Sequence, residues 1–357
     1  MNQRSFKPFG GGGRRKKIFH NIFEEIISLE NLFSAWDEFK KGKRKKFDVQ
    51  RFECNLEDNI FQLHEELESK DYKHSDYTSF YVQDPKLRHI HKACVRDRVL
   101  HHAIFKILYP IFDQSFIFDS YSCRIKKGTH MAVNRLCQFA RKVGENNTKN
   151  CYILKLDIKR FFDSIDHNIL ISLIEKKIKD ENAIWLIEMI IKSFSVLPNK
   201  GLPLGNITSQ LFANIYLNEL DRFIKHELKE KYYIRYCDDF IILKSDKGYL
   251  EEFIASVGFF LGEKLKLSLH PDKIGIRKYH QGIDFLGYVS FPKHRILRTK
   301  TRKRMIRKIE RKNKELRQGM IPKEFFSQTL QSYLGMLKHC NSFGIRSKIL
   351  KISNYAN

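Results

Sequence analysis

Apolar positions along this chain recur at two different spacings, which predicts a protein that mixes helices with strands. Helical spacing runs through residues 18–67, and it returns at residues 96–108, 167–178, 183–195, 207–229 and 249–262. Short strand-like stretches fall at residues 77–83, 152–158, 232–236 and 240–243. Strands interspersed with long helices favour an α+β architecture.

Basic segments interrupt this pattern. Residues 1–17 combine four consecutive glycines with four consecutive basic residues, a composition that predicts a flexible basic arm. Residues 40–46 read KKGKRKK and are expected to form a basic loop between helices, suited to phosphate contact or to exposure in solvent. From Arg295 the chain is strongly basic, and a further helical block follows around residues 325–339. We expect a separate helical unit there that tracks a nucleic-acid backbone.

The net positive charge of the chain favours a negatively charged binding partner. The chain has 66 Lys and Arg against 41 Asp and Glu, a formal net charge of +25. Nucleic acid is the leading interpretation, and a merely basic soluble protein or one that binds anionic lipid is the alternative. The longest apolar stretches fall short of the roughly 20 residues that span a membrane, so no membrane association is expected.

Cysteine and histidine usage indicates no metal centre built from these residues. The seven cysteines form no CxxC pair and fit no zinc spacing, which favours a reduced, cytoplasmic setting. The fourteen histidines lack nearby cysteines or an HExxH pattern, so they are interpreted as structural or RNA-contacting.

Carboxylates at strand ends carry the strongest chemical signal. Asp157 ends an apolar strand, and the adjacent Asp238 and Asp239 sit between two further strands. Adjacent anions repel and are costly to desolvate, and a divalent cation removes that penalty. Hard oxygen ligands favour Mg²⁺, with Mn²⁺ as a substitute. Two such ions about 3.5 to 4 Å apart would activate a 3′-hydroxyl and stabilise the leaving pyrophosphate in nucleotidyl transfer.

The segments LDIKRFFDSIDH (residues 156–167) and YCDD (residues 236–239) resemble motif A and the YxDD box of reverse transcriptases, and the similarity extends from about residue 31 to about residue 346. It implies an RNA-directed DNA polymerase with a right-hand fold: fingers over residues 18–150, a palm over 151–292 and a helical thumb over 293–357. Asp157 and Asp238 would be the main metal ligands, Asp239 the third carboxylate, and Phe162 the aromatic that excludes a 2′-hydroxyl.

The next motif of the family falls at residues 201–221 and departs from the form typical of group II intron enzymes. Leu204 replaces the usual Gln before Gly205, and Gln210 replaces the usual Pro. The LG…SQ pattern resembles the reverse transcriptases of diversity-generating retroelements. An apolar Leu204 removes an amide that would hydrogen-bond near the template base and the incoming nucleotide. Low fidelity is therefore a hypothesis.

Further binding residues are implied by the same similarity. A triphosphate clamp is expected from four cationic residues, Arg96, Arg98, Arg124 and Lys127. Lys273 would neutralise pyrophosphate. Phe285, Leu286 and Gly287 fall in a segment that resembles the primer-grip hairpin.

Three functions remain open at this level. The first is an error-prone polymerase of a diversity-generating retroelement, which would copy template RNA into cDNA from deoxynucleoside triphosphates, together with a small basic accessory protein. The second is a stand-alone bacterial enzyme in phage defence that uses a dedicated non-coding RNA. The third is a catalytically silent RNA-binding protein, which predicts erosion of the three carboxylates, and all three are present.

Overall fold

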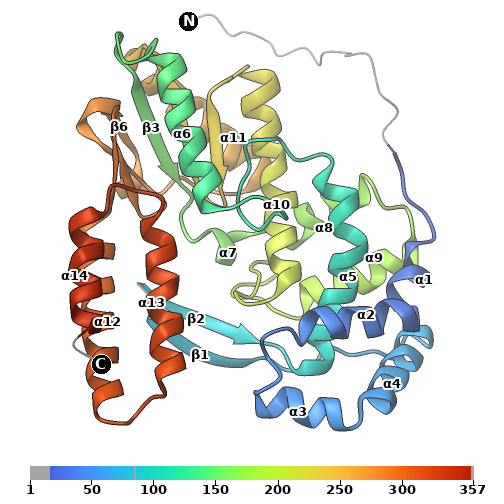
Figure 1. Cartoon of the computed structure of the whole chain (residues 1–357). Coiled ribbons are helices and arrows are strands. Elements are labelled where there is room, and N and C mark those ends of the chain that lie inside the picture. Colours follow the sequence, from blue (N-terminus) through green and yellow to red (C-terminus); the bar gives the residue numbers. More distant parts are fainter. Residues whose placement is uncertain (1–16, 84–85, 355–357) are drawn as a thin grey trace, which may run out of the picture. The chain divides into compact units, whose positions relative to one another are not determined.

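The computed structural model describes residues 17–83 and 86–354, which form two compact units (Figure 1). The first unit joins residues 1–115 to residues 162–217, and the second joins residues 116–161 to residues 218–357. The predicted basic arm lies outside the described residues except for Lys17. The predicted boundaries of fingers, palm and thumb stay a prediction.

Helices make up most of the first unit. The central helix, α5 (Val95–Asp113), is buried along most of its length. It packs against α1 (Ile22–Ile27), α2 (Leu29–Phe39), α3 (Phe47–Cys54) and α4 (Leu56–Glu68). Residues 40–46 form the turn between α2 and α3, which confirms the predicted basic loop.

Two of the remaining helices of this unit, those that follow Asp166 and Asp180, begin at acidic caps. α8 (His167–Glu175) and α9 (Glu181–Lys192) follow the short α7 (Phe161–Ser164), and α10 (Ile207–Arg222) comes next. The Asp180 carboxylate accepts hydrogen bonds from two backbone N–H groups in the first turn of α9 and from the backbone N–H of Phe23. An acidic side chain at this position satisfies N–H groups that have no partner within the helix.

A two-stranded antiparallel sheet projects from the helices of the first unit. β1 (Thr78–Gln83) pairs with β2 (Leu87–Lys92) through six cross-strand partners, from Thr78–Lys92 to Gln83–Leu87. Every residue of β1 is exposed. The strand expected at residues 77–83 is therefore present, but as one arm of an exposed hairpin.

The second unit is built on a four-stranded antiparallel sheet in the order β4-β5-β3-β6. Its strands are β3 (Tyr152–Asp157), β4 (Tyr233–Tyr236), β5 (Asp239–Lys244) and β6 (Gly275–Lys278). Ile241 and Leu243 of β5 share a core with α6 (Thr129–Val143). Phe240 and Ile242 alternate with them, face the other side of the sheet and are also buried. The helix α11 (Lys247–Leu265) packs on β5 as well.

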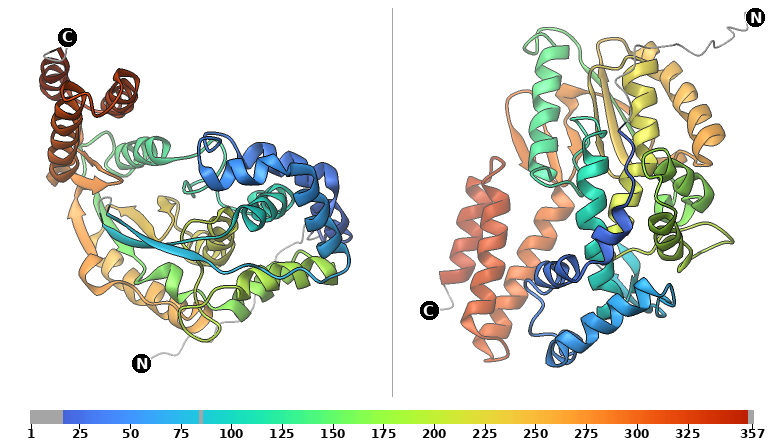
Figure 2. Two further views of the ribbon diagram at one scale, coloured as in Figure 1. Left: turned by 90° about the horizontal axis from the view of Figure 1, so that it is seen from below. Right: turned by 90° about the vertical axis from the view of Figure 1, so that its right-hand side faces the viewer.

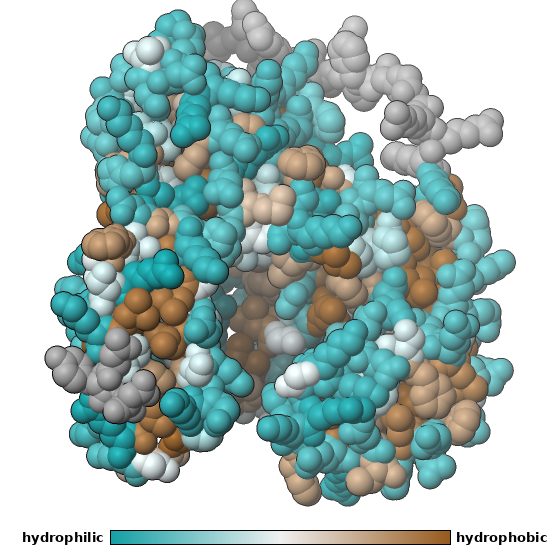
Figure 3. Space-filling view, viewed as in Figure 1, coloured by the Kyte–Doolittle hydropathy of each residue, from teal (hydrophilic) through white to brown (hydrophobic). Residues whose placement is uncertain are grey.

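A second, three-stranded sheet and three helices complete this unit. The strands are β7 (Ile283–Phe285), β8 (Tyr288–Ser290) and β9 (Arg295–Leu297). α12 (Thr299–Arg317) packs against both α13 (Lys323–Leu337) and α14 (Phe343–Asn354), and Figure 3 shows hydrophobic residues among hydrophilic ones over α13 and α14. The predicted basic helical unit is present, and α14 is a third helix that the sequence pattern did not predict.

The α+β class is confirmed, and Figure 2 shows the helices and strands of each unit from two further sides. None of the helices within the described ranges combines the length and apolar character needed to cross a bilayer.

Candidate active site

The three aspartates predicted to carry the chemistry lie at one end of the four-stranded sheet. Asp157 is the last residue of β3, and Asp239 is the first residue of β5. The two are direct cross-strand partners, so their side chains leave the same face of the sheet about 5 Å apart. Asp238 precedes Asp239 in the turn after β4, and its carbonyl accepts a 3.2 Å hydrogen bond from the backbone N–H of Ile158. The register of the sheet thus brings the trio together.

The turn that carries Asp238 has a strained backbone, and a buried ion pair supports it. Cys237, at its tip, has φ 58°, a left-handed conformation that is uncommon for a residue other than glycine. The fully buried Arg235 donates to both oxygens of the fully buried Asp221, at 2.7 and 2.6 Å. Its Nη1 also donates to the Cys237 carbonyl at 3.2 Å. This ion pair holds the backbone of the turn beneath the carboxylates.

Burial and repulsion make the Asp238 and Asp239 carboxylates costly to keep charged. Burial, followed by repulsion from Asp157, raises the pKa of the Asp238 carboxyl. Burial raises the pKa of Asp239 to about 6, although Lys155 acts to lower it. Asp239 Oδ1 is buried and accepts no hydrogen bond from any group in the described residues. Such an oxygen is expensive to bury without a partner.

Two lysines neutralise part of this charge. Lys273, in a short 3-10 turn (Pro271–Lys273), lies 2.6 Å from Asp157 Oδ1. Lys155 Nζ lies 3.1 Å from Asp239 Oδ2. As these side chains stand, no three His, Cys, Asp or Glu groups in the described part of the chain are arranged to hold a metal ion. The hard oxygen donors and the orphaned Asp239 Oδ1 nevertheless fit a divalent cation, provided that the lysines give way.

Lys155→Met is therefore expected to strengthen divalent-metal binding, because it removes the ammonium group that competes for Asp239. An ion pair at this level of exposure is worth at most about 1 kcal/mol, which corresponds to a gain of up to about fivefold in Mn²⁺ affinity. Titration of the metal-free protein, followed by electron paramagnetic resonance of free Mn²⁺, measures it. Lys264→Met, which removes an exposed charge on α11, is the control. Unchanged or weaker binding by Lys155→Met would show that the lysine does not compete.

The segment predicted as a primer grip lies on the same unit and touches this site. Phe285 ends β7 and is fully buried, and Leu286 and Gly287 form the tight turn to β8 with φ 49° and 90°. Lys155, besides pairing with Asp239, donates to the carbonyl of Asp284 at 3.3 Å. One lysine thus connects the β7–β8 hairpin to a candidate metal ligand.

Arg124 and Lys127, predicted to clamp a triphosphate, contact their own loop. Arg124 Nη1 donates to the carbonyls of Ile117 and Ser120, at 2.7 and 3.1 Å. Lys127 Nζ donates to the Phe118 carbonyl at 2.9 Å and lies 3.4 Å from the centre of its ring. In this structure both cations order the loop, and a role at the nucleotide stays a prediction.

Arg96 and Arg98 belong to the first unit and are also paired. Arg96 contacts Glu66 at 2.6 Å and Asp97 at 3.3 Å. Arg98 contacts Asp48 at 2.6 Å. Arg98 lines a cavity of about 430 Å³ that Gly205 and Gln210 also line. Of the two arginines, Arg98 is the one that a ligand in this cavity would meet.

The motif at residues 201–221 is hydrogen-bonded to β2 through its backbone. The backbone N–H of His91 donates to the Leu204 carbonyl at 3.1 Å. Gly205 has φ +127°, a backbone conformation that strains any other residue, and a Cβ there would make a tight 3.3 Å contact with the His91 carbonyl. Phe162, in α7, is half-buried, and its carbonyl accepts from the backbone N–H of Leu202 at 2.8 Å. These contacts lie within the first unit.

Sequence reasoning missed Lys155 and the Arg235–Asp221 pair. The spacing of two residues puts Lys155 on the same strand face as Asp157, so strand periodicity could have identified it. Asp221 lies fourteen residues before Arg235, on a helix, and no local pattern joins them.

Several known proteins resemble this chain in sequence. The family model described as reverse transcriptase (RNA-dependent DNA polymerase) matches residues 79–290. Protein YkfC of Escherichia coli is 26% identical over 281 residues, covering 67% of this chain and 71% of that protein. Group II intron-encoded protein LtrA of Lactococcus lactis is 28% identical, covering 57% of this chain and 44% of that protein. The retron Ec73 reverse transcriptase of Escherichia coli is 32% identical, covering 28% of this chain and 35% of that protein.

Proposed function

We propose that this chain, which belongs to the reverse transcriptase family of RNA-dependent DNA polymerases, extends a primer on an RNA template at the site formed by Asp157, Asp238 and Asp239. The right-hand polymerase fold that the sequence predicted is the fold of this family. The observation that carries the proposal is the cross-strand pairing of Asp157 with Asp239 next to the turn that holds Asp238. The family implies an RNA template and deoxynucleoside triphosphates as substrates and DNA as the product.

Different residues of the chain would bind the metal ions, neutralise the leaving group, position the primer and select the sugar. The three carboxylates would hold two divalent cations, which supply activation of the 3′-hydroxyl and stabilisation of the leaving pyrophosphate. Lys273, 2.6 Å from Asp157, would leave this carboxylate and pair with the departing pyrophosphate, whose charge it would neutralise. The β7–β8 hairpin, tied to the site through Lys155, would position the primer end. Phe162 would select against a 2′-hydroxyl.

Error-prone synthesis in a diversity-generating retroelement is the biological role that we propose. Its support is the apolar Leu204 beside Gly205, together with Gln210 on the first turn of α10. A small basic accessory protein would belong to that setting. The second candidate function is a stand-alone enzyme in phage defence that uses a dedicated non-coding RNA. It would need the same carboxylates, and the similarity to the retron enzyme supports it.

Leu204→Gln is expected to lower the frequency of misincorporation, because the added amide gives one hydrogen bond that depends on correct base-pair geometry. One such bond is worth about 1 kcal/mol, or roughly a fivefold change in error frequency. Sequencing of the products made on one RNA template by the native chain and by the variant measures it.

Leu197→Gln, an exposed leucine of the same unit, is the control. If the native chain already makes errors as rarely as the variant, the error-prone role is excluded. The polymerase assignment would be unaffected. Synthesis that requires one particular neighbouring RNA would favour the second candidate.

A further inference from the structure

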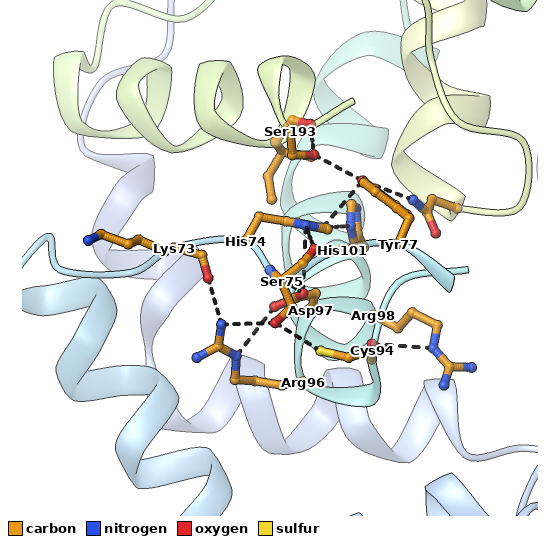
Figure 4. Close-up of polar contacts among 12 residues, drawn as sticks. Lys73, His74, Ser75, Tyr77, Cys94, Arg96, Asp97, Arg98, His101 and Ser193 are labelled. Atoms are coloured by element: carbon orange, nitrogen blue, oxygen red, sulfur yellow. Dashed lines mark hydrogen bonds and ion pairs between the residues drawn. The ribbon is translucent and has the colours of Figure 1, made fainter. Parts of the chain in front are cut away.

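A buried polar network within the first unit connects the segment between α4 and β1 to the first turn of α10. His74, whose side chain is 3% exposed, shares a 3.1 Å hydrogen bond with His101 of α5 through the Nε2 atoms of the two rings (Figure 4). His101 Nδ1 lies 2.6 Å from Thr208 Oγ1, and both residues are buried. The fully buried Asp97 accepts from the backbone N–H of Ser75 at 2.9 Å and so fixes the segment that carries His74.

The directions of these hydrogen bonds follow from the atoms at the end of the network. His74 Nδ1 lies 2.6 Å from the Ser75 carbonyl, which can only accept, so this nitrogen carries a proton. In a neutral His74 ring Nε2 must then accept, and the proton between the rings belongs to His101 Nε2. Burial lowers the pKa of His101 to about 3, so this ring is neutral too. Its Nδ1 therefore accepts from the Thr208 hydroxyl.

A second branch of the network reaches the same part of the chain. The Tyr77 hydroxyl shares a 2.9 Å hydrogen bond with Ser193 Oγ, which itself donates to the Ile190 carbonyl at 2.8 Å (Figure 4). Because the Ser193 proton is used in this way, the Tyr77 hydroxyl is the donor to Ser193. Asn206 Nδ2 lies 3.5 Å from the Tyr77 oxygen, which leaves a lone pair for it. Residues 206 and 208 are thus both tied to the network.

The segment held in this way is the motif with the unusual sequence. Thr208 lies on the first turn of α10, two residues before Gln210. The Leu204 carbonyl is held separately by the backbone N–H of His91. Both His101 and Gln210 line the cavity of about 430 Å³. Apolar packing would hold the helix without burying hydrogen-bonding groups, whereas a satisfied polar network also fixes the position of the chain.

We propose that His101 and Thr208 are positioning residues that hold residues 204–210 in place, and that they thereby set the affinity for the nucleotide that pairs correctly with the template. The proposal rests on the proposed function, in which this motif meets the template base and the incoming nucleotide. His101 and Thr208 act through Leu204 and Gln210. The three carboxylates belong to the second unit, so the rate at saturating nucleotide should not depend on this network.

Thr208→Val tests the proposal, because it keeps the shape of the side chain but removes the only hydroxyl that donates to His101. Insertion of one correct deoxynucleotide by the full chain is expected to show a KM about fivefold higher at an unchanged kcat, the effect of one lost hydrogen bond. Insertion of an incorrect nucleotide should change less, so discrimination falls. Thr208→Ser, which restores the donor, should match the native chain.

A matched control separates positioning from a general loss of stability. Ile60→Val leaves a small cavity in the core of the same unit, on α4, and should destabilise the protein without changing KM. Native KM in Thr208→Val, or an equal rise in Ile60→Val, would overturn the proposal.

Hydrogen exchange in EDTA, without substrates, measures the positioning itself. Backbone amides of residues 204–212 should exchange faster in Thr208→Val than in the native chain, and at the native rate in Thr208→Ser. Unchanged protection of this segment in Thr208→Val would also overturn the proposal. Failure of the native chain to insert any nucleotide would instead contradict the proposed function, and the exchange measurement would still decide whether His101 and Thr208 hold the motif.

Discussion

Asp238→Asn is expected to lower the rate of primer extension by more than ~100-fold, while the metal-free protein becomes more stable to heat. Loss of a residue that only orients a metal ligand costs about 10- to 100-fold, so loss of a ligand should cost more. The gain in stability follows from the raised pKa of Asp238: burial and repulsion from Asp157 disfavour its charge, and asparagine carries none.

Two measurements check this pair of effects. Extension of a primer with Mg²⁺ gives the rate, and thermal unfolding in EDTA gives the stability of the metal-free protein. Glu263→Gln, which neutralises an exposed carboxylate on α11, should change neither. Retained extension by Asp238→Asn would exclude this carboxylate as a ligand, and a lower melting temperature in EDTA would mean that its charge is satisfied without metal.

Arg235→Met is expected to destabilise the protein by about 3–5 kcal/mol, because it leaves the fully buried Asp221 carboxylate without its partner. It also removes the hydrogen bond to the Cys237 carbonyl, which supports a turn in a strained conformation. Urea unfolding measures the loss of stability. Extension should fall as well, even at temperatures where the variant remains folded.

The double variant Arg235→Met with Asp221→Leu provides the matched comparison, because replacing both members of a buried pair by apolar groups removes the unpaired charge. Its stability should exceed that of Arg235→Met. If the single variant unfolds like the native protein, the buried ion pair does not hold the turn, and the support assigned to Arg235 is wrong.

The parts of this fold that local patterns determine were predictable. Short apolar runs predicted β3, β4 and β5, because buried residues fill both faces of the sheet at these strands. The adjacent Asp238 and Asp239 were singled out because two neighbouring carboxylates between apolar strands need a counter-charge. Their convergence with Asp157 depends on the strand register, which no local pattern reveals. The resemblance to a known family predicted the grouping of the three residues, and the structure shows the register that produces it.

Features that depend on contacts distant in sequence were not predictable. Arg235 looked like an ordinary strand cation, yet it is fully buried against Asp221 on a helix. The side chains of Arg96 and Arg124 were expected to face a nucleotide, but in this structure they bind groups within their own units. The return of residues 162–217 to the first unit has no local signal either, because compact units form from contacts rather than from contiguous segments.

Single-turnover addition of one deoxynucleotide to a DNA primer on an RNA template tests the central claim most directly. The native chain should form the extended primer when Mg²⁺ is present, stop when EDTA is added and resume with Mn²⁺, and the variants Asp157→Asn and Asp238→Asn should form almost none. Extension by those variants at the native rate, or its absence in the native chain even with the RNA encoded beside its gene, would contradict the assignment of these carboxylates to RNA-directed DNA synthesis.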